Sequence, residues 1–463
     1  MMCIRYRAAS QLSPEPEEGD GKPHVKPRIK KKIIWKRLPF GTAYDLDCAL
    51  FDVEKIHKSP QLNALSQWDY DIFGLAKMWP CTVLSSMCFR ILKDTGLISA
   101  FGLLEKELIL YLHVLESGYR DIPFHNRVHA ADVLHGVYYL CTQPVAGLKQ
   151  SPRSKNVGTA NLQVVTSFRE KQFGERQKKG NQKSTLPIDP NSERTYGILA
   201  ANITRLELLA VLLAAAMHDY DHPGRSNRFL VLTKSPLAQL YNNRSVLEQH
   251  HVSKSWELME SYPECNFLKN MHPTERSKLQ QLTVDCVLAT DLDRHSIVLE
   301  TFNDQVKAGL NWADETHRLS VLLMVIKLAD VSGPCKRFDL HSSWMNLLCQ
   351  EFYQQGEEER NRGWEITKYM DGNHPETAKL QSSFITNVVQ PLLTAYSNAG
   401  LMPSQWVLPV PPALDGMEDA PNQGDGERQS LMKDCIPMKH LQDNLSYWTN
   451  ILEHKGQKGG SAL

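Results

Sequence analysis

The chain has 463 residues, of which 42% are hydrophobic and 22% charged, and its 52 basic residues equal its 52 acidic ones. This composition is ordinary for a soluble globular protein, and the balanced charge gives no long-range field that would attract nucleic acid or an anionic membrane. None of the ten cysteines belongs to a C-x-x-C pair, and the first residues carry no apolar signal segment. We therefore expect reduced thiols in the cytosol or nucleus, with the cytoplasm preferred.

Residues 1–40 are predicted to be disordered. The stretch over 13–21 is rich in Pro, Glu and Gly, which bury little apolar surface. In the basic run over 28–37, Lys and Arg interleave with Ile and Trp. Such a run is typical of a peripheral membrane-contact or localisation patch, and also of a solvated linker. We favour the linker.

Residues 41–407 are predicted to form one all-α domain. Apolar residues recur at helix-compatible spacings from 91 to 115, and no segment shows sustained strand alternation. A compact multi-helix architecture is therefore expected. Further helices are predicted over 128–140, 205–217, 245–261, 275–290, 314–329, 340–355 and 376–397.

Three other segments interrupt or follow this pattern. Residues 145–196 are polar and basic with little periodicity, which indicates a large loop insertion. Residues 408–437 begin with a Pro-rich run and read as a linker. Residues 438–455 are predicted to form an amphipathic helix that packs back on the domain or onto another subunit as a homodimer contact.

Ionisable residues cluster at the ends of apolar segments. His125 and His129 are four positions apart and would share one face of a helix that begins just after Pro123. The pentapeptide His218-Asp219-Tyr220-Asp221-His222 follows the apolar run over 206–217, and Asp330 ends another apolar helix. Unpaired charges are costly in such places, and a divalent cation bound by imidazole and carboxylate ligands would compensate them.

Alternatives exist for each cluster. A lone histidine is more often structural than a ligand. Asp330 could instead pair with Lys327 or Arg337, but a carboxylate at a helix C-terminus faces an unfavourable dipole. The convergence of three such clusters favours a metal-dependent hydrolase.

The motifs resemble those of a known family. The His-Asp pair is a feature of the HD superfamily of phosphohydrolases. The segments over 124–133, 218–224, 241–251 and 289–292 are similar to class I 3′,5′-cyclic nucleotide phosphodiesterases, and the resemblance runs from about Trp68 to Trp406. Within that family, the segments over 118–123, 142–144 and 398–403, the insertion and the terminal helix resemble the cGMP-inhibited class, class 3.

The resemblance implies roles for individual residues. His129, His218, Asp219 and Asp330 match the metal ligands, with zinc expected at the first site and magnesium or manganese at a second site that Asp219 bridges. A hydroxide between the two ions would attack phosphorus, and His125 matches the general acid that protonates the leaving 3′-oxygen. Glu248 matches a carboxylate that orients this histidine, and His222 and Asp291 match other supporting positions.

A purine pocket is implied in the same way. Gln381 and Phe384 match the base-binding glutamine and the aromatic clamp, and Leu348 matches the aliphatic residue on the other face of the base. Ordinary helix packing is the alternative for this pair. The family's usual Tyr before the general acid is Phe124 here, Gln249 replaces a usual Asn, and the loop over 368–375 differs.

We therefore expect an all-α HD-type phosphodiesterase catalytic domain that hydrolyses cAMP, and cGMP as a second substrate, to 5′-nucleoside monophosphates. This reaction would terminate cyclic nucleotide signalling. Two other hypotheses remain: an HD-type hydrolase acting on a linear nucleotide, against which Gln381 and Phe384 argue, and a non-enzymatic scaffold, against which the complete ligand set argues.

Overall fold

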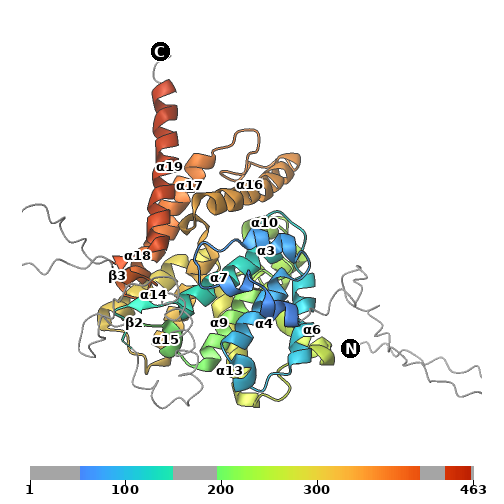
Figure 1. Ribbon diagram of the computed structural model, residues 1–463. Coiled ribbons are helices and arrows are strands. Elements are labelled where there is room, and N and C mark those ends of the chain that lie inside the picture. The colour runs from blue at the N-terminus through green and yellow to red at the C-terminus, as the bar shows by residue number, and fades with distance from the viewer. Residues whose placement is uncertain (1–52, 150–195, 407–432, 460–463) are drawn as a thin grey trace, which may run out of the picture. The chain divides into compact units, whose positions relative to one another are not determined.

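The computed structural model describes residues 53–149, 196–406 and 433–459. Within these ranges the chain is helical apart from two ladders of two short strands each, so the all-α prediction is confirmed (Figure 1). The α-helices are α2 (Val53–Lys58), α3 (Ile72–Met78), α4 (Val83–Asp94), α5 (Leu97–Ala100), α6 (Glu105–Ser117), α7 (Arg127–Thr142), α9 (Arg205–Met217), α10 (Asn227–Leu232), α11 (Pro236–Leu240), α12 (Val246–Ser261), α13 (Pro273–Leu288), α14 (His295–Ala308), α15 (Glu315–Asp330), α16 (Phe338–Asn361), α17 (Thr377–Phe384), α18 (Gln390–Asn398) and α19 (Ile436–Gly459).

Each helix predicted between 128 and 397 has a counterpart. The segment predicted as one helix over 376–397 is divided into α17 and α18 by a π-helical turn, η7 (Ile385–Val389). Short 3-10 turns lie between other helices: η1 (Leu62–Ala64), η3 (Leu199–Ala201), η4 (Pro263–Cys265), η5 (Leu292–Arg294) and η6 (Gly333–Cys335).

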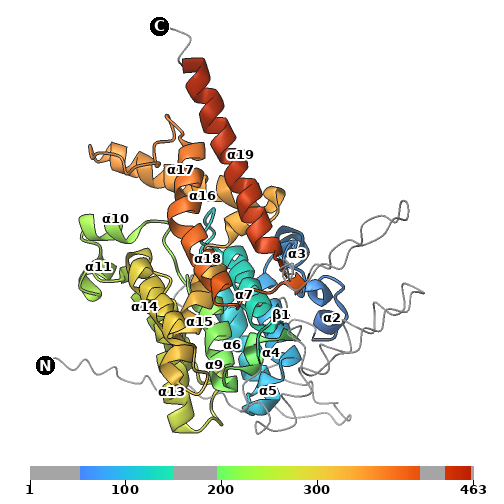
Figure 2. The same ribbon diagram turned by 90° about the vertical axis from the view of Figure 1, so that its left-hand side faces the viewer.

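The core is built around α9, in which every residue from Glu207 to Met217 is buried. A capping box closes its N-terminus: the Thr204 hydroxyl accepts the Glu207 N–H at 3.2 Å, and the Glu207 carboxylate accepts the Thr204 N–H at 2.7 Å. Glu207 also pairs with Arg318 of α15 at 2.9 Å. Helices α7 and α13 pack against α9, and α15 packs against α7 (Figure 2). The ends of these helices therefore meet inside the domain.

The two ladders close the boundaries of the insertion and of the linker. Strands β1 (Val145–Ala146) and β2 (Tyr196–Gly197) pair antiparallel, so both ends of the segment predicted as a loop over 145–196 are joined. Strands β3 (Gln405–Trp406) and β4 (Lys433–Asp434) pair in the same way, within or beside the predicted linker over 408–437.

Helix α19 begins two residues before the predicted start at 438 and continues to Gly459. It packs against α17 and η6 and lies alongside α18 in both views (Figures 1 and 2). The helix therefore packs against its own domain, and its contact with another subunit stays a prediction.

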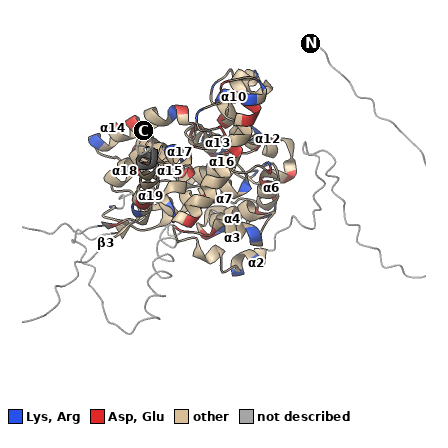
Figure 3. Ribbon diagram, turned by 90° about the horizontal axis from the view of Figure 1, so that it is seen from above, with Lys and Arg blue, Asp and Glu red and all other residues tan. Residues whose placement is uncertain are grey.

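Charged residues of both signs are interspersed along the described helices (Figure 3). No single helix in the described ranges has the length and hydropathy needed to cross a membrane; one bent pair, α3 with α4, would meet the criterion by composition alone. The predictions for residues 1–40 and for the interior of the insertion lie outside the described residues.

Candidate active site

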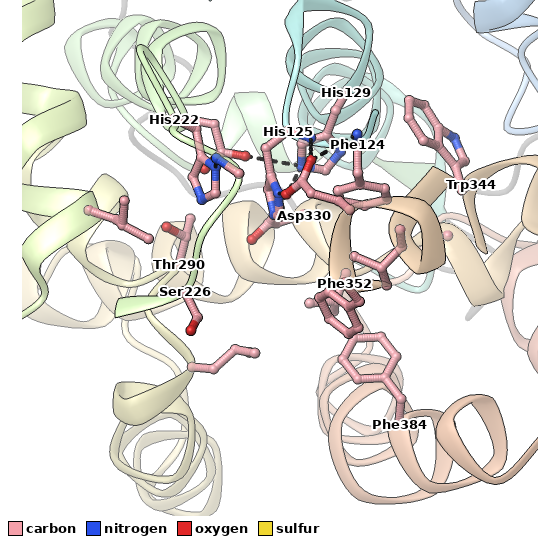
Figure 4. Close-up of a pocket in the computed structure, with 18 of the residues that line it drawn as sticks. Phe124, His125, His129, His222, Ser226, Thr290, Asp330, Trp344, Phe352 and Phe384 are labelled. Carbon is pink, nitrogen blue, oxygen red and sulfur yellow. Dashed lines mark hydrogen bonds and ion pairs between the residues drawn. The ribbon is translucent and has the colours of Figure 1, made fainter. Parts of the chain in front are cut away.

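The clusters meet because three packed helices present their ends to one cavity (Figure 4). Asn126 caps α7, its side-chain oxygen accepting the N–H groups of Val128 at 2.8 Å and His129 at 3.4 Å. This cap fixes His129 in the first turn of α7. His218 is the residue that ends α9, and Asp330 is the last residue of α15.

Four side chains converge within hydrogen-bonding range of one another. His129 Nε2 lies 3.2 Å from Asp330 Oδ1 and 3.4 Å from Asp219 Oδ2. His218 Nε2 lies 3.3 Å from the same oxygen of Asp219 and 3.4 Å from Asp330 Oδ1. The predicted ligand set is therefore assembled.

The chemistry of these atoms fits a divalent cation. His218 Nδ1 lies 2.9 Å from the Ala215 carbonyl oxygen, which can only accept, so Nδ1 carries a proton and Nε2 is the nitrogen directed at the two carboxylates. Burial opposes a charge on the ring, but those carboxylates raise the pKa of His218, so a cation bound at Nε2 would displace a proton from it. His218 Nε2 also lies 3.4 Å from His129 Nε2. Two imidazole nitrogens and two carboxylates brought together in this way form an N/O ligand set that could hold a divalent cation.

Asp219 faces two groups at once. Its Oδ2 points to His129 and His218, whereas its Oδ1 lies 3.7 Å from His251 Nε2, a buried nitrogen that hydrogen-bonds to no described residue. Asp219, His222 and His251 form a second group with the spacing of metal ligands. An unpartnered buried nitrogen beside a carboxylate fits a second cation or its water.

The neighbouring histidines control the ionisation of Asp219 and Asp330. Burial opposes the negative charge of Asp330, but hydrogen bonds from His129 and His218 hold its pKa well below the usual range. Burial acts against Asp219 in the same way, and His218 lowers its pKa strongly. Both carboxylates are therefore ionised, as metal ligands must be.

His125 stands beside this centre. Its Nδ1 contacts Oε1 of Glu351 on α16, and Oε2 of the same carboxylate accepts the N–H groups of Phe124 at 3.0 Å and of His125 at 3.2 Å. The His125 ring stacks on His222 with centroids 4.0 Å apart. Burial opposes the charged ring, but Glu351, Asp219 and Asp330 raise the pKa of His125 to about 9.

His125, His222 and Glu351 are also spaced closely enough to hold an ion. However, His125 Nδ1 is already engaged by Glu351, and His222 Nδ1 accepts the Gly224 N–H at 3.0 Å. These contacts favour a proton-carrying His125 over a metal-binding one.

The prediction that Glu248 orients His125 is wrong. The Glu248 carboxylate on α12 accepts hydrogen bonds from the Asn227 side chain at 3.0 and 3.2 Å, and burial together with nearby Asp291 raises its pKa to about 7. Helix α16 brings Glu351, not Glu248, against the His125 loop. Glu248 nevertheless lines the same cavity.

The alternative pairing of Asp330 is also wrong. The buried Lys327 ammonium donates to the carbonyl oxygens of Ala289 at 2.9 Å and Asp291 at 3.1 Å, and Arg337 pairs with Asp339. The Asp291 side chain accepts from the Ser245 hydroxyl at 2.6 Å. Lys327 therefore fixes the turn that carries Asp291, a predicted supporting residue.

The cavity has a volume of about 440 Å³, and every predicted site residue lines it except the buried His218. Gln381, Phe384 and Leu348 come from α17 and α16, and Phe384 and Phe352 lie across the cavity from the histidines (Figure 4). The cavity thus joins an end lined by the histidine and aspartate cluster to an aromatic end. It also includes residues that the sequence did not single out: Glu351, Asn227, His341, Trp344, Phe352 and Met370.

Comparisons with known proteins agree with this site. Residues 194–405 match the 3′5′-cyclic nucleotide phosphodiesterase family. The chain is 38% identical over 424 residues to the human cGMP-inhibited 3′,5′-cyclic phosphodiesterase 3A, covering 86% of this chain and 36% of that protein, and 42% identical over 419 residues to the rat protein of the same name, covering 85% and 36%. It is 36% identical over 420 residues to a probable 3′,5′-cyclic phosphodiesterase of Caenorhabditis elegans, covering 89% and 57%.

The chain is also similar to a solved structure of a phosphodiesterase domain. The phosphodiesterase domain of the Salpingoeca rosetta rhodopsin phosphodiesterase aligns with a TM-score of 0.62 and 26% identity, covering 90% of this chain and 99% of that one. The chain spans 36–57% of the length of the three curated relatives named above.

Proposed function

Because this chain belongs to the class I 3′,5′-cyclic nucleotide phosphodiesterase family and is similar to its cGMP-inhibited members, we propose that it hydrolyses cAMP and cGMP to 5′-nucleoside monophosphates. The observation that carries this proposal is the convergence of His129, His218, Asp219 and Asp330 with His125 beside them. The activities named for the human and Caenorhabditis elegans relatives support the choice of cyclic nucleotides as substrates.

Two cations complete the proposed mechanism. His129, His218, Asp219 and Asp330 would hold zinc, and the outer oxygen of Asp219 would contribute to a magnesium or manganese site. When bound, these ions would lower the pKa of water and supply the nucleophile that attacks phosphorus.

His125 supplies the proton for the leaving group. Since Nδ1 faces Glu351, Nε2 is the nitrogen that can reach substrate. As the bond between phosphorus and the 3′-oxygen breaks, the Nε2 proton passes to that oxygen, so the product leaves as an alcohol rather than an alkoxide. Glu351 holds the ring and stabilises its positive charge, and the stacked His222 fixes the plane of the ring.

The aromatic end of the cavity accounts for the nucleobase. The Gln381 amide can donate to and accept from a purine edge, while Phe384 and Leu348 offer apolar surfaces to its faces.

We also propose a cellular location and role for this activity. A cytoplasmic enzyme of this kind would end cyclic nucleotide signals. The eight cysteines in the described residues are all free thiols, which supports a reducing compartment.

The test is initial-rate hydrolysis with magnesium, measured on cAMP, on cGMP and on a panel of linear phosphodiesters. We expect turnover of the cyclic substrates alone, and slow cGMP turnover with strong competition against cAMP. His125→Ala should abolish turnover while the metal content stays unchanged, and the exposed His374→Ala is the matched control. Turnover in the His125 variant, or metal-free wild-type protein, would refute the proposal.

A further inference from the structure

One face of α19 carries three polar side chains at intervals of four residues: His440, Asn444 and Trp448. His440 Nε2 lies 2.9 Å from Asp69 Oδ2. The Asn444 amide donates to the carbonyl oxygens of Pro334 at 2.8 Å and Lys336 at 2.9 Å. The Trp448 indole N–H donates to His341 Nε2 at 2.9 Å. Asn444 and Trp448 are buried, so these contacts are shielded from water.

The partners of this face form one wall of the substrate cavity. The wall begins directly after Asp330, and Val331, Ser332, Gly333, Pro334 and His341 all line the cavity. Asp69 connects to the same wall, since its Oδ1 accepts the Arg337 N–H at the start of α16 at 3.0 Å. Each of these three contacts therefore ends, directly or through Asp69, on residues 334–341.

The carbonyls of η6 depend on distant side chains. Asn444 satisfies those of Pro334 and Lys336, and the Trp68 indole N–H donates to the carbonyl between them, that of Cys335, at 2.7 Å. Three consecutive carbonyls at the end of a short 3-10 turn are thus held by two side chains from remote parts of the sequence. Removing the amide leaves two buried acceptors unpaired, which favours a different conformation of the turn.

Trp448 also sets the protonation of a cavity residue. An indole nitrogen can only donate, so His341 Nε2 must be the unprotonated nitrogen and Nδ1 must carry the proton. Burial lowers the pKa of His341 to about 4, which agrees with a neutral ring. The ring orientation at this end of the cavity is therefore fixed from α19.

We propose that α19 is a positioning element of the substrate site: Asn444 and Trp448 hold the cavity wall formed by residues 331–341 in the shape that binds nucleotide. The inference rests on the proposed function for its substrate. None of the described α19 side chains lines the cavity, so their effect passes through the wall. Detaching α19 should weaken nucleotide binding, while His125 and Glu351, which pair with each other, continue to act.

The test compares Asn444→Leu, which keeps the branching at Cγ and removes the amide, with Asn450→Leu on the exposed side of the same helix. We expect KM for cAMP to rise about fivefold in the first variant, equivalent to about 1 kcal/mol at 1.4 kcal/mol per tenfold, with kcat within about twofold. Asn450→Leu should leave both constants unchanged. Trp448→Phe keeps the aromatic packing, loses only the N–H, and should raise KM by a smaller factor.

Two further measurements separate the possible failures. Calorimetric titration of cAMP into His125→Ala protein, with and without Asn444→Leu, reports binding without turnover. Hydrogen exchange over residues 333–345 reports the wall itself and should become faster in the Asn444 variant. An unchanged KM and binding constant beside a lowered thermal midpoint would make α19 a structural anchor and overturn the inference. A variant that loses both kcat and its bound metal would also overturn the inference, because the effect would then pass through Asp330. Wild-type protein without turnover would refute the proposed function instead.

Discussion

Glu351 offers a sharp test of the proton donor, through the substitution Glu351→Gln. The glutamine keeps the size of the side chain, and its carbonyl oxygen can still accept the N–H groups of Phe124 and His125. The amide group that then faces His125 Nδ1 is a neutral donor in place of a carboxylate. The backbone geometry is retained, and the stabilisation of the charged ring is lost.

The expected magnitude follows from the pKa of His125. Burial opposes the charged ring, yet Glu351 and the other carboxylates raise the pKa from 6.5 to about 9, which corresponds to roughly 3 kcal/mol in favour of the protonated form. Burial lowers the pKa of His125, and Glu351 is the main group that raises it. Without the Glu351 charge, the pKa of His125 should therefore fall to 6.5 or below. At pH 7.5 at most about a tenth of the rings would then be protonated.

Acid catalysis requires the protonated ring, which fixes the direction of the effect on the pH profile. The raised pKa keeps wild-type His125 protonated through neutral pH, and activity is lost only as the pH rises through that value. In Glu351→Gln the alkaline limb should move to lower pH. Bound cations would lower the pKa of His125 in both proteins, so the difference between the two profiles remains.

The assay is kcat/KM for cAMP from pH 5.5 to 9.5. Glu351→Gln should lose at least about tenfold at pH 7.5 and progressively less toward pH 6. Glu358→Gln, on the same helix and paired with Arg225, is the matched control and should follow the wild-type profile. A Glu351 variant with the wild-type alkaline limb would show that Glu351 does not set the protonation of the acid.

Three other changes test the metal centre, the base pocket and the core. Asp330→Asn replaces an anionic ligand with a neutral one, so elemental analysis should find less bound zinc and turnover should fall with it, whereas the exposed Asp304→Asn should match wild type. Gln381→Ala should raise KM for both cyclic nucleotides about tenfold with a smaller effect on kcat, and an unchanged KM would remove Gln381 from base binding. Arg318→Met should lower the free energy of unfolding by about 3–5 kcal/mol in urea titration, because it leaves Glu207 buried without its partner; a loss below about 1 kcal/mol would contradict this.

The fold was predictable where local signals agreed. Helix α9 has the predicted bounds of 205–217, since its apolar run lies between a Thr204-Glu207 capping box and the polar His218. Helix α14 was not predicted although Val298, Phe302 and Val306 recur in it at helical spacing; its apolar stripe is short, and only Val298 and Phe302 are buried. The division between α17 and α18 does have a local signal, because Pro391 at the start of α18 has no N–H to donate to the preceding turn; the prediction of one continuous helix did not use it.

The residues of the candidate site also differ in whether a local sequence signal marks them. The metal-binding residues stand in short motifs beside apolar helices, where an unpaired charge needs explanation, and they were found for that reason. Glu351 lies 226 positions from His125, on a helix with many other acidic residues, and nothing in its neighbours distinguishes it. Its role arises only when α16 packs against the loop before α7. Long-range contacts of this type need the tertiary structure.

Phe124, which stands where the family usually has Tyr, makes its contacts in the site through its ring and its backbone. Its ring lies 4.7 Å from the His129 ring and 5.5 Å from Trp344, centroid to centroid, so it packs the metal-binding histidine from one side. Its backbone N–H donates to Glu351, which in turn contacts His125. Neither contact involves a hydroxyl group. The position therefore supports the metal ligand through its ring and the proton donor through its backbone, and Phe in place of the family's usual Tyr leaves both contacts in place.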